Sequence, residues 1–285
     1  MINVKNLYHD YEGKKNYAVE NVSFTIEQGE IFGFLGPSGA GKSTVQGIMT
    51  GLLPLQQGTI TYGGTSISRQ SKSFFNRIGV SFEHPNLYLK LTGLENLKFY
   101  AGLFSVPTED PAKLLNMVGL KAAAYKKAKS YSKGMKQRLV FARSVINRPD
   151  ILFLDEPLSG LDPTTAAVIK DIIRKKKEEG CTIFLTTHNM FVAEELCDRV
   201  AFINDGKIVA MDAPKELKLA YGERSVRVEY KNNGSAPAEE VLFLDRREDT
   251  ERFQYLLAQK EIRTVHSQEA TLEQIFMKLT GRGLE

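Results

Sequence analysis

A glycine-rich stretch that ends in Lys42 and Ser43 has the residue types and the spacing needed to hold a phosphate chain. Residues 36–43 read GPSGAGKS and match the pattern G-x-x-x-x-G-K-[ST], directly after an apolar run typical of a buried strand. Glycines let consecutive backbone N–H groups curl around a phosphate, and the start of a following helix adds partial positive charge. We expect Lys42 to bridge the β- and γ-phosphates and Ser43 to bind Mg²⁺. The expected nucleotide contacts of this segment are Gly36, Pro37, Ser38, Gly39, Ala40, Gly41, Lys42, Ser43 and Thr44.

Two acidic residues follow a second apolar run. Residues 151–154 read ILFL, and Asp155 and Glu156 come directly after them. Ligands of open α/β sheets bind at the carboxyl ends of the strands, which is where both acids would lie. We expect Asp155 to hold Mg²⁺ and Glu156 to be the general base that polarises an attacking water. The two motifs together predict a nucleoside triphosphatase.

The elements that must position these residues can be predicted from hydrophobic periodicity. Strands and helices alternate, which favours an α/β fold with a parallel sheet, and the mostly helical stretch 94–147 would be an inserted subdomain. The sequence NDG at 204–206 lies between two apolar runs and indicates a hairpin. The expected strands are 22–26, 30–35, 59–62, 78–82, 151–154, 182–186, 200–203 and 207–210, and the expected helices are 42–53, 133–147 and 163–179.

The pattern changes near Gly222. A strand at 226–230 is followed by a polar linker or loop, 231–238. Beyond it we expect strands at 241–244 and 263–265 and helices at 251–259 and 271–279. The chain therefore divides into a nucleotide-binding domain at 1–222, with its helical subdomain at about 86–148, and a small α+β appendage at 223–285.

The composition and the lengths of the apolar runs argue against a secreted or a membrane-spanning protein. The 285 residues are 42% hydrophobic and 25% charged, with a net charge of +4, as in an ordinary globular protein. No signal peptide begins the chain, and its apolar runs are too short to cross a bilayer, so a membrane role would require a partner. The two cysteines, Cys181 and Cys197, lack metal-binding or redox-motif spacing, which favours a reducing compartment.

The residues after Glu156 narrow the choice among nucleotide-binding proteins. Pro157 is followed by LSGLD at 158–162, and Thr187 and His188 come just after the next expected strand. From about Asn3 to about Gly222 the arrangement resembles the nucleotide-binding domain of ATP-binding cassette (ABC) transporters. The resemblance implies a P-loop NTPase (RecA-like) core with an antiparallel β subdomain, and ATP and Mg²⁺ as cofactors.

The resemblance also assigns roles to three further residues. Asp162 ends the family's D-loop and would lie near nucleotide. His188 would be the family's switch histidine and hydrogen-bond the γ-phosphate, which makes it a catalytic residue together with Glu156 and Lys42. Tyr11 fits the aromatic residue that stacks on adenine, although Tyr8 and Tyr17 are competitors for that role.

The stretch YSKGMKQR at 131–138 occupies the place of the family's signature motif, commonly LSGGQ. Ser132 and Gly134 match that motif, whereas Tyr131, Lys133 and Met135 depart from it. Ser132 also suits the start of a helix, whose N-terminus would point at a phosphate. In the family this phosphate belongs to the ATP of the opposite subunit, so the resemblance implies a dimer with two nucleotides at its interface.

Another departure lies at Glu83, where the family usually has Gln. That residue contacts Mg²⁺ and links the site to the membrane partner. A carboxylate also binds Mg²⁺, but it cannot donate a hydrogen bond and it adds negative charge beside the triphosphate. We therefore expect activity to persist with an altered metal affinity or coupling.

The function implied by the resemblance is that of an ATPase subunit of a membrane exporter, because residues 269–283 resemble the end of bacterial drug- and antibiotic-exporting cassettes. Its expected partners are an integral membrane subunit and a second cassette at the cytoplasmic face of the membrane. We expect a homodimer, and pairing with a different cassette stays open. Nucleic acid is not an expected partner.

Two other functions remain open. A soluble cassette ATPase acting on ribosomes or DNA is favoured only by the basic stretch 121–138, which contains no Asp or Glu. A regulatory module without turnover is disfavoured by Glu156 and His188.

Overall fold

The structure is a computed structural model that describes the chain except for residues 15, 70–71, 232–236 and 282–285. It divides into two compact units, Met1–Asp212 and Ala213–Gly283. The predicted boundary after Gly222 is misplaced by about one helix, because α8 (Pro214–Tyr221) packs against α10 (Leu272–Thr280) within the second unit.

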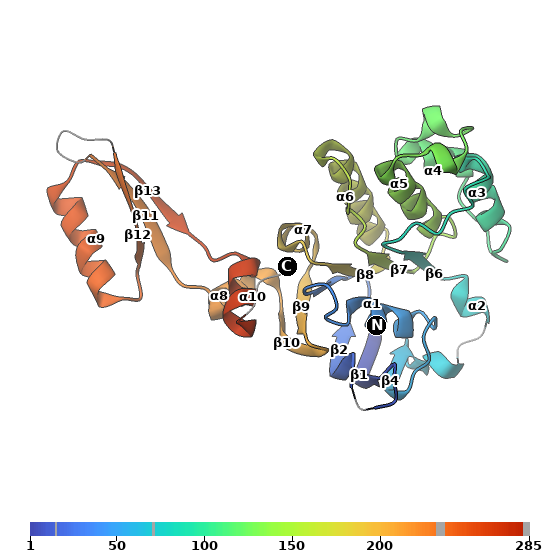
Figure 1. Ribbon diagram of the computed structural model, residues 1–285, viewed down its shortest axis with the longest axis horizontal. Coiled ribbons are helices and arrows are strands. Elements are labelled where there is room, and N and C mark those ends of the chain that lie inside the picture. The colour runs from blue at the N-terminus through green and yellow to red at the C-terminus, as the bar shows by residue number, and fades with distance from the viewer. Residues whose placement is uncertain (15, 70–71, 232–236, 282–285) are drawn as a thin grey trace. The chain divides into compact units, whose positions relative to one another are not determined.

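A six-stranded sheet forms the centre of the first unit (Figure 1). Its order is β10-β9-β3-β8-β7-β6, and every neighbouring pair is parallel except β10 with β9, which form the predicted hairpin. The strands are β3 (Ile31–Leu35), β6 (Ile78–Ser81), β7 (Ile151–Asp155), β8 (Thr182–Thr187), β9 (Arg199–Asn204) and β10 (Lys207–Asp212). The parallel order brings the ends of β3, β7 and β8 to one edge, which is where the predicted site residues lie.

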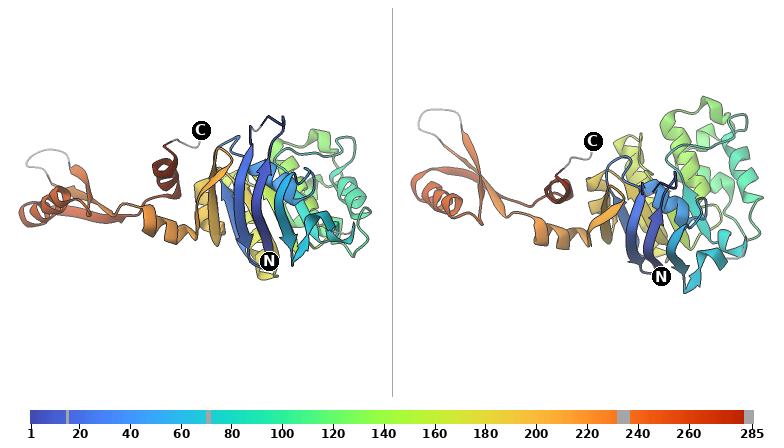
Figure 2. Two further views of the ribbon diagram at one scale, coloured as in Figure 1. Left: turned by 90° about the horizontal axis from the view of Figure 1, so that it is seen from below. Right: turned by 60° about the horizontal axis from the view of Figure 1, so that its bottom comes forward.

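A second, antiparallel sheet covers one side of the first. Its strand order is β2-β1-β4-β5. Figure 2 shows these strands, coloured blue to cyan, as a separate layer. The strands are β1 (Ile2–His9), β2 (Val19–Ile26), β4 (Gln57–Tyr62) and β5 (Thr65–Ser66). Strand β1 was not among the expected strands. It pairs with both β2 and β4, so it is the central strand that holds this layer together.

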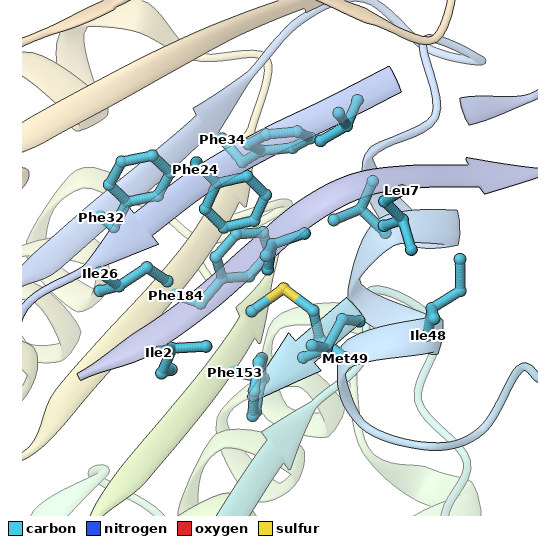
Figure 3. Packing of buried hydrophobic residues seen from close by; sticks show 14 of the residues in the cluster. Ile2, Leu7, Phe24, Ile26, Phe32, Phe34, Ile48, Met49, Phe153 and Phe184 are labelled. Atoms are coloured by element: carbon cyan, nitrogen blue, oxygen red, sulfur yellow. The ribbon is translucent and has the colours of Figure 1, made fainter. Parts of the chain in front are cut away.

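The main hydrophobic core lies between the two sheets and includes α1 (Lys42–Met49). Figure 3 shows apolar side chains from both sheets and α1 meeting there. The rings of Phe24 and Phe32 stack with centroids 5.2 Å apart, and Phe184 stacks 6.0 Å from Phe24. This packing fixes the strand before the phosphate loop and the helix after it.

Two predicted helices are shorter in the structure. α1 ends at Met49 rather than near residue 53, because Gly51 adopts a left-handed φ of 75° that ends the helix. α5 (Lys133–Ser144) ends three residues early, where the side-chain amide of Asn147 donates instead to the backbone of Asn76 and Ile78.

The inserted segment is mainly helical, as expected, and lies beside β6 (Figure 1). It contains α3 (Gly93–Ala101), α4 (Pro111–Met117), two 3₁₀ turns at Lys121–Ala123 and Ala128–Ser130, and α5. The remaining helical elements of the first unit are a 3₁₀ turn at Ile67–Arg69, α2 (Lys72–Phe75), α6 (Pro163–Glu178) and α7 (Met190–Leu196).

The second unit is an α+β structure with its own core. Its antiparallel sheet has the order β12-β11-β13, and α9 (Arg247–Gln259) packs along one face (Figure 1). The strands are β11 (Ser225–Tyr230), β12 (Ala238–Phe243) and β13 (Ile262–Gln268). Val228 and Leu256 are fully buried between sheet and helix. Most of the predicted 231–238 loop lies outside the described residues.

Candidate functional site

A cavity of about 420 Å³ opens where the phosphate loop meets the ends of β7 and β8. It brings together residues that are more than 140 positions apart in the sequence, from Tyr11 to His188. The lining residues are Tyr11, Ala18, Ser38, Gly39, Gly41, Lys42, Ser43, Thr44, Glu83, Asp155, Glu156 and His188. Sequence reasoning named all of them except Ala18.

The phosphate loop has a backbone that only glycine fits well at two positions. Gly41 has a φ of 105°, and a Cβ there would lie 2.5 Å from the carbonyl oxygen of Ala18. A Cβ at Gly36 would lie 2.2 Å from the carbonyl oxygen of Ile203. The loop is therefore packed tightly on its outer side, and the start of α1 opens toward the cavity.

Lys42 is almost fully buried at the mouth of this loop, with 8% of its surface exposed. Its ammonium donates to the carbonyl oxygens of Gly36 at 2.7 Å and Pro37 at 2.9 Å. Burial lowers the pKa of Lys42, while the nearby carboxylates of Glu156, Asp155 and Glu83 oppose this shift. A buried cation held among oxygen atoms in this way is suited to receive phosphate oxygens.

Asp155 and Ser43 lie side by side, as expected for two ligands of one cation. The Ser43 hydroxyl donates to Oδ2 of Asp155 at 3.2 Å, and the Thr186 hydroxyl donates to Oδ1. Burial raises the pKa of the Asp155 carboxyl, and these hydroxyl contacts partly offset that shift. Hydroxyl and carboxylate oxygens suit Mg²⁺, which commonly takes one or two carboxylates and completes its shell with water and phosphate.

Glu83 lines the same cavity from the loop after β6. In the described part of the chain, no three His, Cys, Asp or Glu side chains gather closely enough to hold a metal alone. The expected ligands Ser43, Asp155 and Glu83 include only two carboxylates, so they would form part of the coordination shell and a bound nucleotide would complete it. The donor set therefore fits Mg²⁺ bound together with a triphosphate.

Glu156 and His188 form a hydrogen-bonded pair at the cavity. The Nδ1 of His188 lies 2.6 Å from Oε1 of Glu156, and the His188 backbone N–H donates to the same oxygen at 2.8 Å. The Thr187 hydroxyl donates to Oε2 at 2.9 Å. Both carboxylate oxygens are thus held in place, which suits a group that must accept a proton from a positioned water.

Tyr11 lines the cavity with its hydroxyl 3.0 Å from that of Thr44, and 62% of its surface is exposed. Tyr8 and Tyr17, the two competitors, pack against each other with ring centroids 5.4 Å apart and are not among the lining residues. Of the three tyrosines, Tyr11 has the exposed ring beside the phosphate loop.

Ser132, Gly134 and Asp162 do not line this cavity. Ser132 caps α5 by accepting from the N–H of Met135 at 3.2 Å, and Asp162 caps α6 by accepting from Thr165 at 3.0 Å. The two caps adjoin through Gly160, because a Cβ added at Gly134 would lie 3.3 Å from the Gly160 carbonyl oxygen. The start of α5 and the loop before α6 therefore lie against each other, and neither contributes a residue to the lining of this cavity.

Two departures from the signature motif have structural explanations. Tyr131 is buried and donates its hydroxyl to the carbonyl oxygen of Ala123 at 2.7 Å, so it anchors the 3₁₀ turn at Lys121–Ala123. Lys133 is exposed, and its aliphatic stem lies against Gly160, where an added Cβ would meet Cε at 3.1 Å.

Sequence reasoning assigned no role to the two threonines at the end of β8. Thr186 holds Asp155 and Thr187 holds Glu156. The signal available was their position directly before His188, on a strand that parallel pairing places beside β7. Gly36, Pro37 and Ala40 were expected contacts but are not among the lining residues, and the carbonyl oxygens of Gly36 and Pro37 accept from Lys42.

Comparison with known proteins agrees with this geometry. The sequence profile described as "ABC transporter" matches residues 19–159. A fluoroquinolones export ATP-binding protein of Mycobacterium tuberculosis is 50% identical over 284 residues, covering 100% of this chain and 94% of that protein. A lantibiotic transport ATP-binding protein of Streptococcus pyogenes is 39% identical over 209 residues, covering 73% of this chain and 89% of the relative.

A solved structure is similar as well. It is the dimeric post-hydrolysis state of an ATP-binding cassette bound to ADP and Pi, with a TM-score of 0.69 and 27% identity. The match covers 75% of this chain and 98% of that one.

The chain belongs to the ABC transporter family and is an ATP-binding cassette with ATPase function. The predicted family and fold class are confirmed. Within the described residues, every helix is too short or too polar to pass through a lipid bilayer.

Proposed function

We propose that this chain hydrolyses ATP with Mg²⁺ to power a membrane exporter whose transmembrane part is a separate subunit. The observation that carries the proposal is the meeting of Lys42, Ser43, Asp155 and the Glu156–His188 pair in one cavity. The relatives named as export and lantibiotic transport ATP-binding proteins support the direction of transport.

In this proposal the phosphate loop and Lys42 bind the triphosphate, and Tyr11 stacks on the adenine. Ser43, Asp155 and Glu83 supply oxygen ligands for the metal. Bound Mg²⁺ neutralises charge on the phosphates and makes the γ-phosphorus easier to attack.

Glu156 is the proposed general base. Its Oε1 is held by His188 and its Oε2 by Thr187, so the carboxylate has a defined orientation toward the cavity. It accepts the proton of the attacking water, while His188 keeps the carboxylate in position and hydrogen-bonds the γ-phosphate.

We further propose that Ser132, Gly134 and Asp162 complete the nucleotide site of a second copy of the chain. Each caps or adjoins the start of a helix of at least twelve residues, and none lines the cavity of its own chain. ATP bound between two copies would close the homodimer, and hydrolysis would reopen it. That cycle would drive the membrane subunit from the cytoplasmic face.

The experiment is purification of the chain from membranes of its host, followed by ATPase measurement. Mg²⁺-dependent release of phosphate and co-purification of an integral membrane protein are expected. Association with ribosomes that nuclease abolishes would instead favour a soluble cassette ATPase. ATP binding without phosphate release would indicate a regulatory module.

A further inference from the structure

Glu83 lines the nucleotide cavity from the loop that follows β6, and residues elsewhere in the chain hold that loop in place. Among the described residues, no hydrogen bond or ion pair holds the Glu83 side chain itself, and the residue is exposed. Its place at the cavity is therefore set by the backbone after β6. The contacts of that backbone decide whether Glu83 can act as a ligand.

Three residues beyond Glu83, the loop is held by a buried arginine of α5. Nη1 of Arg143 donates to the Asn86 carbonyl oxygen at 2.9 Å, and Nη2 donates to Oδ1 of Asn86 at 2.6 Å. Nη1 also donates to the Tyr100 hydroxyl at 3.0 Å, and the guanidinium lies 4.5 Å from the centre of the Tyr100 ring. A planar guanidinium holds both the backbone and the side chain of one residue with donors in a fixed fork, whereas lysine carries its three donors on one nitrogen at the end of a flexible stem.

The burial of Arg143 is not explained by a gain in the stability of the fold. Only 6% of its surface is exposed, and the titratable groups of the described chain that act on it are the hydroxyls of Tyr100 and Tyr88 rather than carboxylates. Burial lowers the pKa of Arg143, which reflects the cost of removing the cation from water. A buried cation without a counterion carries a desolvation cost, so stabilisation of the fold does not by itself account for its burial.

The helix that carries Arg143 is also fixed to the strand that leads to Glu83. A Cβ at Gly79 in β6 would lie 1.9 Å from the Ser144 carbonyl oxygen, so α5 and β6 are in close backbone contact. Asn147 donates to the carbonyl oxygen of Ile78 at 2.8 Å. The same helix begins at the Ser132 cap, eleven residues or about 16 Å before Arg143.

We propose that Arg143 is a positioning residue that holds Glu83 at the metal side of the nucleotide cavity and joins that side to the helix beginning at Ser132. This inference rests on the proposed function of Glu83. Arg143 acts through Asn86 and does not touch the nucleotide. Its loss should weaken the response to Mg²⁺ rather than ATP binding as such.

The test compares Arg143→Met and Arg143→Lys with Arg138→Met in the full-length chain. Arg138 is a matched control, because it lies on the same helix and donates to the carbonyl oxygens of Val118 at 3.0 Å and Gly119 at 3.2 Å, away from the Glu83 loop. The Lys variant keeps the buried charge in case the Met variant folds poorly.

The first readout requires no nucleotide. Amide hydrogen exchange across residues 82–89 should accelerate in both Arg143 variants and stay unchanged in Arg138→Met. The second readout is the Mg²⁺ concentration that half-saturates ATPase activity. It should rise about tenfold in Arg143→Met, as is common when a residue that orients a metal ligand is lost.

The third readout is a double-mutant cycle with Glu83→Gln. If Arg143 acts through Glu83, Arg143→Met should produce no further Mg²⁺ shift in the Glu83→Gln background. Equal Mg²⁺ shifts in the two backgrounds, or unchanged exchange across 82–89, would overturn the inference. A wild-type chain that lacks Mg²⁺-dependent hydrolysis would overturn the proposed function instead, while the exchange measurement would still decide whether Arg143 holds the loop.

Discussion

Glu156 adopts a strained backbone conformation, with a φ of 44° that non-glycine residues rarely take. Such a conformation costs on the order of 1–3 kcal/mol. The side-chain contacts with His188 and Thr187 and the backbone bond from Glu156 to the Thr186 carbonyl oxygen at 3.0 Å help to offset this cost. At the residue scale, the orientation of one carboxylate therefore has a cost in the free energy of folding, which is consistent with the proposed role of Glu156 as base.

Glu156→Gln should therefore separate binding from hydrolysis. The amide keeps the size of the side chain but cannot accept the proton, so hydrolysis should fall by about 10²–10⁴-fold. ATP should still bind, and the dimer should accumulate. Phosphate release and size-exclusion chromatography with ATP measure the two effects. Glu109→Gln, which removes only an ion pair with Arg148, is the control, and hydrolysis at the wild-type rate in Glu156→Gln would refute the assignment.

Glu83→Gln should change the metal dependence and leave the fold intact. The amide oxygen is a weaker ligand than a carboxylate, so the half-saturating Mg²⁺ concentration should rise about tenfold. Titration of ATPase activity with Mg²⁺ at fixed ATP measures this. If rate and Mg²⁺ dependence both match the wild type, Glu83 does not contact the metal.

At the scale of elements, α5 and β6 form the junction between the helical segment and the parallel sheet. Asn147 ties the start of β6 to the helix end, Gly79 allows close backbone contact, and Arg143 holds the loop beyond the strand. The helix is therefore attached both to β6 and to the loop after β6 that contains Glu83.

Gly79→Ala should disturb this junction. The added Cβ would meet a backbone oxygen at 1.9 Å, and neither the helix nor the strand can move without losing contacts, so we expect a loss of about 1–3 kcal/mol in the free energy of unfolding. Gly102→Ala is the control, because its φ of −68° suits alanine and the nearest atom to a Cβ is 3.4 Å away. Urea denaturation compares the two, and equal midpoints would argue against tight α5–β6 packing.

At the scale of the whole molecule, the chain consists of two units with separate cores. The nucleotide cavity is lined only by residues of Met1–Asp212. The second unit has a cavity of its own, about 530 Å³, between α10 and the sheet, but no phosphate loop. Nucleotide should therefore act on the first unit alone in the isolated chain.

ATP should stabilise the two units unequally. At one hundred times its Kd, a ligand adds about 2.7 kcal/mol to the stability of the unit that binds it. Hydrogen exchange should slow at core amides of β3 and β8, while the amides of Val226 and Val228 in β11 should exchange unchanged. Equal protection of β11 would mean that the units are energetically coupled.

The sequence by itself determined the family, the fold class and the set of residues that can bind a triphosphate. Local spacing was sufficient for GPSGAGKS, because a glycine loop between a strand and a helix has a fixed geometry. It was also sufficient for Asp155 and Glu156, because the end of a buried strand in a parallel sheet defines where they lie. The predicted roles of Ser132, Gly134 and Asp162 remain predictions, since they concern a second copy.

Only the tertiary structure decided which partners hold these residues. Thr186 and Thr187 reach the two acids because β8 pairs with β7, and Arg143 reaches Asn86 because α5 packs along β6. The end of helix 133–147, the domain boundary and strand β1 also depended on contacts between distant segments. Periodicity reports which face of a segment is buried, but it does not report which distant atoms satisfy its polar groups, and those contacts orient the site.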